Sequence, residues 1–414
     1  MGILRASSRP LTPARATRAS MAHGRASSVS GTAAARRARC GLGLPRSARR
    51  LALAMRFATC TVLLGLLLGA DQARAQAESV PPASLDEGRR PLARQGWPVA
   101  AALVPGVLVH GSGHFVAGER RTGLRLAAMG GVGLAGMVGG ILSLWPTGAA
   151  KQIAGPAIGL TMAGGALFTS SLFGDLYGLF APAGGTGRAP SWAPRLEAAA
   201  GLLLVHDPVF PHTAFSHLEL WLGWRWLRAG MVSDVGLDRS NQRLHAPLRL
   251  RLPSGQPGRF LELELAATHH RYGPQGFAFA YGEIVASGRI GLDVLGPTLA
   301  GAFLDGGLGV ALGAIRYDGL GTERDEMLLG RFGTGMYFGQ DPWGGGEARL
   351  YYDHRHDGFA GGMKMPGLGS GTMGHVGLGV RRFFGPRWGA SLDMQAGSAY
   401  LATLAVVLRE VAPP

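Results

Sequence analysis

The chain has 414 residues, of which 47% are hydrophobic, and its formal net charge at pH 7 is +15. Thirteen of its 41 Lys and Arg residues and one of its 26 Asp and Glu residues fall within residues 1–75, which leaves 28 basic and 25 acidic residues in the rest of the chain. Because the excess basic charge is concentrated in this leader, a nucleic-acid-binding role loses its main support, and no nucleic-acid partner is expected.

The first 75 residues divide into two segments. Residues 1–54 are rich in Arg, Ala and Ser and have no hydrophobic periodicity, so we interpret them as a non-mature or misassigned leader, with a transit peptide as the rival interpretation. Residues 55–75 resemble a secretory signal peptide. Its features are a positive start at Met55-Arg56, the apolar run Val62–Leu68 and the cleavage pattern Ala73-Arg74-Ala75. We therefore predict export, with Met55 as the true start.

The two cysteines of the chain, Cys40 and Cys60, both precede the predicted cleavage site. The mature chain is therefore expected to contain no disulfide, no zinc thiolate site and no cysteine nucleophile. No nucleotide-binding fingerprint or EF-hand loop is present, and no cofactor is predicted.

A polar, proline-containing linker is predicted over residues 76–97, followed by a glycine-rich apolar helical hairpin over residues 98–182. The uncharged runs Leu126–Ala150 and Gln152–Gly174 exceed the length needed to cross a bilayer. Small residues at the spacing that brings helices close occur in both runs, at Gly136 and Gly140 and at Gly155 and Gly159. Whether the hairpin spans a membrane stays open, and we favour an arrangement in which it packs against or inside the following domain or lies at a membrane surface.

The lead-in of the hairpin contains two histidines, His110 and His114, in the stretch HGSGHFVAGERRTG. They are candidate metal ligands at helical spacing, but Gly111 and Gly113 oppose a continuous helix between them. The segment is similar to short membrane-hairpin domains with a Pro-Gly, a Gly-[Gln/His]-aromatic motif and a basic turn. That resemblance implies a glycine-shaped turn, which we favour over a metal site.

A second short linker is predicted over residues 183–193, and residues 194–410 then alternate between apolar and polar or small side chains. In RFLELELA, Leu261, Leu263 and Leu265 oppose Glu262 and Glu264. The stretch SHLELWLGWRWLR is predicted as one strand whose apolar face consists of Leu218, Leu220, Leu222, Trp224 and Trp226. The pattern predicts an all-β domain of about 10–12 antiparallel strands.

A membrane barrel is favoured over a soluble sandwich for three reasons. Glycines lie on the polar face, a tight turn at residues 384–388 contrasts with a long loop at 353–372, and aromatic residues occur near strand ends. The aromatic residues are Trp192, Trp224, Trp226, Phe338, Trp343, Tyr352, Phe383, Phe384 and Trp388. The pattern resembles the outer-membrane β-barrels of Gram-negative bacteria. The resemblance implies a location in the outer membrane, contact with membrane lipid and assembly by the barrel-assembly machinery, although the printed sequence lacks the terminal aromatic residue common in such barrels.

Candidate chemistry in the β-region is weak. His354, His356 and Asp357 are the best remaining candidate metal ligands. We favour the alternative interpretation, in which they belong to a solvated strand end. The His-x-Ser triplet of outer-membrane lipases occurs only at residues 110–112, outside the β-region. No catalytic residue is therefore assigned, and an enzymatic role is not favoured.

The sequence predicts an exported outer-membrane barrel of structural or passage-forming role. The alternatives are an inner-membrane-anchored protein with a periplasmic β-domain that binds a partner and, third, a lipid-modifying outer-membrane enzyme. Charged residues on the polar faces predict either a selective pore or an interior in which opposite charges pair and block passage, the second being slightly favoured. These residues are Glu219, Arg225, Glu262, Glu264, Glu283, Asp293, Asp305 and Arg349.

Overall fold

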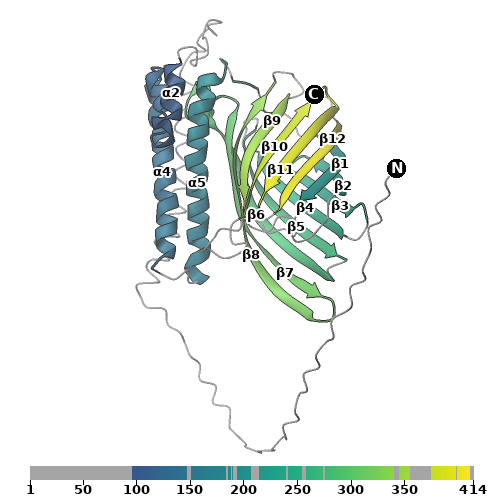
Figure 1. Cartoon of the computed structure of the whole chain (residues 1–414). Coiled ribbons are helices and arrows are strands. Elements are labelled where there is room, and N and C mark those ends of the chain that lie inside the picture. The colour runs from purple at the N-terminus through teal and green to yellow at the C-terminus, as the bar shows by residue number, and fades with distance from the viewer. Residues whose placement is uncertain are drawn as a thin grey trace, which may run out of the picture. The chain divides into compact units, whose positions relative to one another are not determined.

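A computed structural model describes most of the chain from residue 96 to residue 410 (Figure 1). The described residues are 96–146, 151–182, 185–187, 189, 194–206, 214–238, 241–253, 258–273, 276–339, 345–354, 374–397 and 399–410. The predicted leader, the signal peptide and nearly all of the polar linker lie outside the described residues, as does most of the linker at 183–193.

The helical part begins at Trp97 with a broken lead-in and continues into two long helices. Its elements are α2 (Trp97–Leu103), η2 (Pro105–Val107), α3 (Ser112–Val116), α4 (Arg120–Leu144) and α5 (Lys151–Phe180). The β-region follows with β1 (Leu196–His206), β2 (Ala214–Trp224), β3 (Leu227–Gly236), β4 (Asn241–Pro253), β5 (Phe260–Tyr272), β6 (Phe277–Gly291), η3 (Leu292–Val294), η4 (Pro297–Leu299), β7 (Ala302–Tyr317), β8 (Gly321–Phe338), β9 (Gly346–Asp353), β10 (His375–Phe383), β11 (Trp388–Ala396) and β12 (Tyr400–Glu410).

The twelve strands form one closed antiparallel barrel. Each strand pairs with the next along the chain, and β1 closes the ring by pairing with β12 from Leu196 opposite Glu410 to His206 opposite Tyr400. Closure removes every sheet edge, which satisfies the backbone hydrogen bonds that a membrane interior cannot. The predicted barrel class and strand number are confirmed, and a two-sheet sandwich is excluded.

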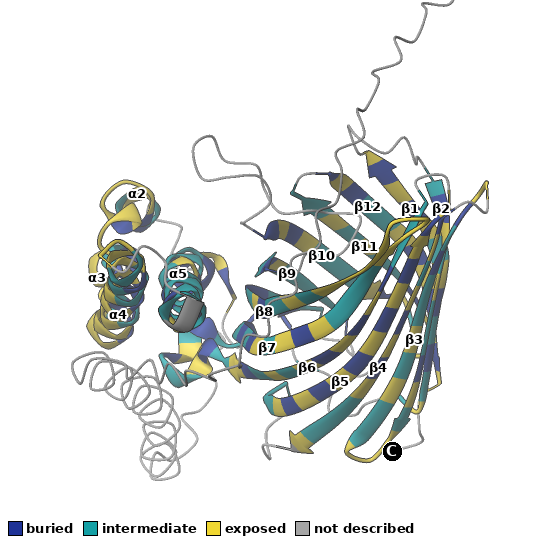
Figure 2. Cartoon of the chain, turned by 90° about the horizontal axis from the view of Figure 1, so that it is seen from below, coloured by how far each residue is buried: buried dark blue, intermediate teal, exposed yellow. Residues whose placement is uncertain are grey.

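The apolar side chains point outward from this barrel. Along β5, Leu261, Leu263 and Leu265 are exposed, whereas Glu262 and Glu264 between them are buried (Figure 2). A soluble protein would place these side chains the other way round. Hydrocarbon is the solvent that favours an apolar exterior, so the outer wall is a lipid-contacting surface.

One predicted strand is interrupted in the structure. SHLELWLGWRWLR was expected to form a single strand, but β2 ends at Trp224 and β3 begins at Leu227. Arg225 adopts a positive φ of 49°, so Arg225 and Trp226 form a two-residue hairpin turn. The alternation runs through the turn because Trp226 is an exposed aromatic residue at the barrel end and mimics an outward strand position.

The barrel has two ends, which we name by their strands. The terminal rim is the end where β1 begins and β12 ends, and the opposite rim is the end where β1 finishes. Exposed aromatic residues gather at the terminal rim, namely Trp224, Trp226, Phe384 and Trp388, and Tyr352 and Tyr400 lie toward the opposite rim. Phe383 departs from the predicted girdle, because its alternation places it inward. Trp192 and Trp343 lie outside the described residues.

Connection length does not separate the rims as simply as predicted. The turn at 384–387 lies at the terminal rim, and at the opposite rim β9 ends and β10 begins, with residues 354–374 between them in sequence, as expected. The short connection at 318–320 also lies at the opposite rim, however, and the terminal rim carries the ten-residue connection 292–301 with η3 and η4. The prediction of uniformly short turns at one rim was wrong.

The helices α4 and α5 lie side by side as an antiparallel pair (Figure 1). Glycines at Gly133, Gly140 and Gly164 let the two backbones approach so closely that a Cβ at any of them would meet backbone atoms of the other helix. The prediction for Gly155 was wrong, since a Cβ there would meet no described atom beyond its own helix within 4 Å, and Gly159 faces the barrel instead. By length and composition, α4 and residues 153–180 are each able to cross a membrane.

The helix α5 packs against the outer side of β7 and β8. A Cβ at Gly159 would lie 3.8 Å from Leu308 of β7, and Met162 covers Gly330 of β8. Near the terminal rim, Leu126 and Tyr177 form a buried apolar cluster with Leu299 of η4. The Tyr177 hydroxyl donates a hydrogen bond to the Ala300 carbonyl. These contacts place the hairpin against the outer wall rather than inside the barrel.

Candidate functional site: the inner wall of the barrel

Glycines on the inner wall lie directly opposite aromatic residues on the next strand. A Cβ on any of these glycines would collide with the ring opposite, so each ring covers its glycine. This arrangement exposes little backbone and holds the ring flat along the wall. The pairs are Trp221 with Gly230, Tyr281 with Gly313, Phe303 with Gly335, Tyr351 with Gly377, and Phe383 with Gly389.

Guanidinium groups stack on four of these five rings. The Arg289 guanidinium carbon lies 3.8 Å from the Phe303 ring centre, and that of Arg409 lies 3.4 Å from the Phe383 ring centre. Two arginines share Trp221 and two share Tyr351, at 4.3–5.1 Å; they are Arg228, Arg249, Arg331 and Arg349. The negative face of an aromatic ring attracts a cation, so each ring fixes the arginine above it.

Carboxylates from neighbouring strands pair with these arginines. Arg289 of β6 contacts Asp305 at 2.9 Å and Glu347 at 2.8 Å and also donates to the Tyr337 hydroxyl at 2.9 Å. Arg349 lies 3.1 Å from the same Asp305. Removing Asp305 would leave Arg289 with Glu347 alone and would take from Arg349 the carboxylate beside it, which is costly in a partly dehydrated site.

Glu197 of β1 joins two strands that lie far apart in the sequence. Its carboxylate accepts from Arg381 of β10 at 2.6 Å and from Arg228 of β3 at 3.1 Å. Both arginines therefore converge on the strand that closes the barrel against β12.

The network continues around the wall. Arg251 contacts Glu262 at 2.7 Å, and Arg249 contacts Glu264 at 2.5 Å. Arg331 contacts Asp353 at 3.0 Å. The Tyr351 hydroxyl donates to Asp393 at 2.9 Å. Charge pairs and stacked rings thus occur on successive strands of the inner wall.

A second polar layer lies nearer the opposite rim. His217 of β2 contacts Asp234 at 2.7 Å, and Arg243 contacts the same carboxylate at 3.2 Å. Thr268 joins His245, at 2.8 Å, to the carboxylate of Glu283. The described groups of this layer pair across β2 to β6.

Six of the eight predicted polar-face charges do line the inner wall: Glu219, Glu262, Glu264, Glu283, Asp305 and Arg349. The other two predictions were wrong. Arg225 lies in the hairpin turn, and Asp293 lies in η3, where it pairs with Arg259 at 2.7 Å. Sequence analysis missed most of the arginines, although Arg249 and Arg251 show the necessary alternation in PLRLRLP.

The two histidines of the lead-in do not share a helix. They belong to a buried cluster of polar groups around Asp175, which we call the Asp175 cluster. Gly111 has a φ of 84° and precedes α3, so the chain turns between His110 and His114 as predicted. Asp175 of α5 organises the turn. Its carboxylate accepts from the backbone N–H groups of Gly111, Gly113 and His114 at 2.8–3.2 Å and from His114 Nδ1 at 2.7 Å.

The Asp175 cluster also contacts the barrel through η4. His114 Nε2 lies 3.4 Å from the Thr298 hydroxyl of η4, which donates to Glu119 at 3.0 Å. On the other side, His110 Nδ1 contacts the Ser171 hydroxyl, and burial lowers the pKa of His110. His110 and His114 thus each have a structural partner. Sequence analysis missed Asp175, whose signal is that it is the one acidic residue in α5.

The other metal candidate is only partly described. β9 ends at Asp353, and His354 is a buried residue whose Nδ1 lies 2.8 Å from the Tyr352 hydroxyl. His356 and Asp357 lie outside the described residues. Among the residues that the structure describes, no three His, Cys, Asp or Glu side chains form a group that could hold a metal ion.

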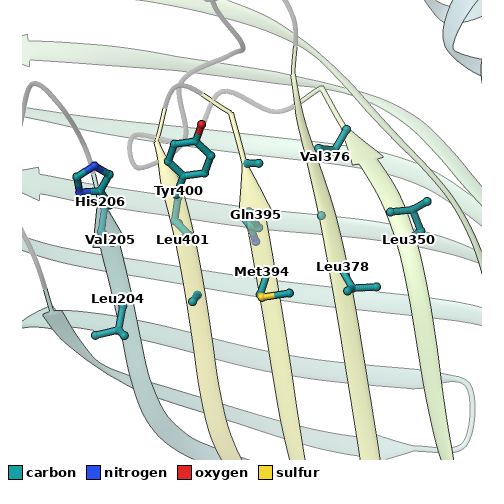
Figure 3. A pocket seen from close by; sticks show the side chains of 13 residues that line it. Leu204, Val205, His206, Leu350, Val376, Leu378, Met394, Gln395, Tyr400 and Leu401 are labelled. Carbon is teal, nitrogen blue, oxygen red and sulfur yellow. The ribbon is translucent and has the colours of Figure 1, made fainter.

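A shallow apolar hollow of about 530 Å³ lies on the outer wall (Figure 3). It forms where the small Ala396 and Ala402 lie among larger outward side chains, including Leu204, Leu350, Leu378, Met394 and Tyr400. In a membrane, lipid chains would cover this surface, so the hollow belongs to the lipid-contacting exterior.

No family model matches the sequence, and no curated protein matches it. Similar solved structures include the KdgM porin (6% identity, 52% of this chain and 99% of that chain, TM-score 0.33) and the translocator domain of the autotransporter NalP from Neisseria meningitidis (13%, 53% and 90%, TM-score 0.32). An outer membrane channel from Pseudomonas putida F1 is also similar (12%, 53% and 97%, TM-score 0.31). The likeness extends to the fold alone. The closed strand ladder and apolar exterior of this chain are themselves those of an outer-membrane barrel.

Proposed function

We propose that this outer-membrane barrel forms a water-filled passage for small hydrophilic solutes. The observation that carries the proposal is the way the inner side chains are held. Rings lie flat over glycines and guanidinium groups lie on the rings, so side-chain bulk follows the wall instead of crossing the lumen.

The exposure of the inward arginines supports this proposal. The Arg331 side chain is 46% exposed and that of Arg251 is 38% exposed, although both point into the barrel. Exposed surface on the inner wall faces open space, and charged groups require that space to hold water. The charges do pair with each other, as predicted for a blocked interior, but they pair along the wall.

Two parts of the proposal concern the barrel's surroundings. We propose that the barrel-assembly machinery inserts the chain, because a closed barrel with an apolar exterior must enter the membrane as it folds. The alternative of a soluble periplasmic β-domain is less well supported, since it would leave the outward leucines in water.

The test combines location and conductance. The full chain should fractionate with the outer membrane, migrate differently on gels before and after boiling, and form discrete conducting channels in planar lipid bilayers. A matched pair of neighbouring variants on β11 locates the pathway. Ser391→Trp adds bulk inside the barrel and should lower single-channel conductance, whereas Leu392→Trp adds it on the lipid side and should not.

Three results would contradict the proposal: recovery in the inner membrane, no conductance from heat-shifting protein, or equal conductance loss in both tryptophan variants. Protein that shows the heat-dependent gel shift but never conducts would instead support a purely structural role for the barrel.

A further inference from the structure

The ion pairs of the inner wall are layered, with the carboxylate beneath and the arginine above. In the pair of Arg251 with Glu262 the side chains are 38% and 7% exposed. In the pair of Arg331 with Asp353, the arginine side chain is 46% exposed and the aspartate side chain 7% exposed. In the pair of Arg381 with Glu197, the arginine side chain is 34% exposed and the glutamate side chain 7% exposed. The carboxylates are therefore covered, and the guanidinium groups form the surface that meets water.

This layering follows from side-chain length and stacking. Asp and Glu are short and lie against the wall, where neighbouring strands supply their partners. Arg is longer, and its flat group rests on a ring while it donates downward to the carboxylate. A guanidinium has five N–H donors, so one ion pair leaves donors available to the lumen.

The consequence is electrostatic. Acidic and basic residues both line the wall, so their charges largely cancel at a distance. Close to the wall the nearer charge dominates, because Coulomb energy falls with separation and the buried carboxylate is farther from the water. A solute in the lumen therefore meets a positive surface.

We propose that the lumen preferentially binds and passes small anionic solutes that carry carboxylate, sulfate or phosphate groups. The inference rests on the proposed passage function and names its solute class. Guanidinium groups suit these anions because their paired N–H donors match two oxygens at once.

Glu347 is the clear exception to the layering. Its side chain is 32% exposed, whereas its partner Arg289 is 10% exposed. This carboxylate opposes the anion preference, so replacing it offers a test in the reverse direction. Glu347→Gln is expected to increase the preference for anions.

The first experiment measures ion selectivity of the full chain in planar bilayers under a potassium chloride gradient. Clefts of one charge sign concentrate counter-ions roughly 10-fold or more, and the underlying carboxylates reduce that effect, so we expect a chloride-to-potassium permeability ratio of about 3. The triple variant Arg251→Gln, Arg331→Gln, Arg381→Gln should bring the ratio to about 1 or below. Arg316→Gln removes the same charge from the outer side of β7 and should leave the ratio unchanged.

A second experiment does not depend on conduction. Calorimetric titration of the detergent-solubilised full chain with tripolyphosphate should show saturable binding that weakens at least about 10-fold in the triple variant but not in Arg316→Gln. Circular dichroism and the heat-dependent gel shift confirm that each variant is folded.

The outcomes separate the two proposals. Conduction with a cation preference, or with a ratio that the triple variant does not change, would overturn the anion inference and leave the passage function standing. Tripolyphosphate binding without conduction would support the arginine surface and overturn the passage function. Absence of tripolyphosphate binding by folded protein, or equal binding by the triple variant, would also overturn the anion inference.

Discussion

Tyr351 shows at the level of one residue how the inner wall is built. Its ring covers Gly377 on β10, its hydroxyl donates to Asp393 on β11, and Arg331 and Arg349 lie above its face. The glycine is required because any Cβ there would occupy the position of the ring. One small residue thus determines where a ring, a carboxylate and two cations lie.

Replacing Gly377 with Val should lift the Tyr351 ring from the wall and break its hydrogen bond to Asp393. Overpacking of this kind lowers the free energy of unfolding by about 1–3 kcal/mol, which urea unfolding of the barrel in lipid vesicles would measure. Gly282→Val is the matched control, since among the described atoms a Cβ at Gly282 would approach only the Leu312 carbonyl, at 4.0 Å. Equal destabilisation by the two valines would show that the ring does not depend on Gly377.

The Asp175 cluster allows a second prediction at the level of single residues. Asp175→Asn replaces a carboxylate that accepts four hydrogen bonds, and its amide NH2 cannot accept. We expect the turn at 110–114 to lose about 1.5–3 kcal/mol of local stability, measured by hydrogen exchange at the Gly111, Gly113 and His114 amides. Ser170→Ala is the control, because the buried Ser170 hydroxyl has no hydrogen-bond partner among the residues that the structure describes. Unchanged exchange rates in the asparagine variant would show that Asp175 does not hold the turn.

The alternation of single residues was readable from the sequence, but their partners were not. Glu262 and Glu264 are predicted to share a face because strand geometry has a period of two. That Arg251 and Arg249 meet them depends on the register of β4 against β5, which the hydrophobic pattern does not specify between strands. Asp175 was missed for a similar reason, since its partners lie more than 60 residues earlier in the chain.

At the level of elements, α5 meets a wall that offers no hydrogen-bonding edge. The contact therefore depends on side-chain shape. Gly330 of β8 leaves a gap that Met162 fills, and Gly159 lets α5 approach Leu308 of β7. The sequence predicts the helices from their long apolar runs, but it does not show which glycines face the other helix and which face the barrel. Gly155 and Gly159 illustrate that limit.

A cross-linking experiment tests this contact directly. In a background with Cys40 and Cys60 replaced by Ser, the pair Met162→Cys and Gly330→Cys should cross-link efficiently with a short bifunctional thiol reagent in isolated membranes. Pairing Met162→Cys with Leu378→Cys, on the outer face of β10, should give no intramolecular product. Cross-linking in the second pair but not in the first would show that α5 packs against a different part of the barrel wall, and would contradict the contact between Met162 and Gly330.

For the whole molecule, the sequence predicts the class of fold and the structure supplies its closure. Alternating strands, inward glycines and rim aromatics are local features, so they are visible in the chain. Closure depends on β1 meeting β12 across some 200 residues, and no local pattern encodes that pairing. The Arg–carboxylate layer depends on this closure, because Glu197 reaches both Arg228 and Arg381 only when the ends of the sheet meet.

Spin labels at single-cysteine sites on β11 and β12 test most directly whether lipid surrounds this barrel and water fills it. In the Cys-free background, labels at Leu392 and Leu404 should collide mainly with oxygen, which dissolves in hydrocarbon. Labels at Ser391 and Thr403 should collide mainly with a water-soluble nickel complex. Oxygen preference at all four positions would contradict a water-filled lumen, and nickel preference at Leu392 and Leu404 would contradict the membrane barrel itself.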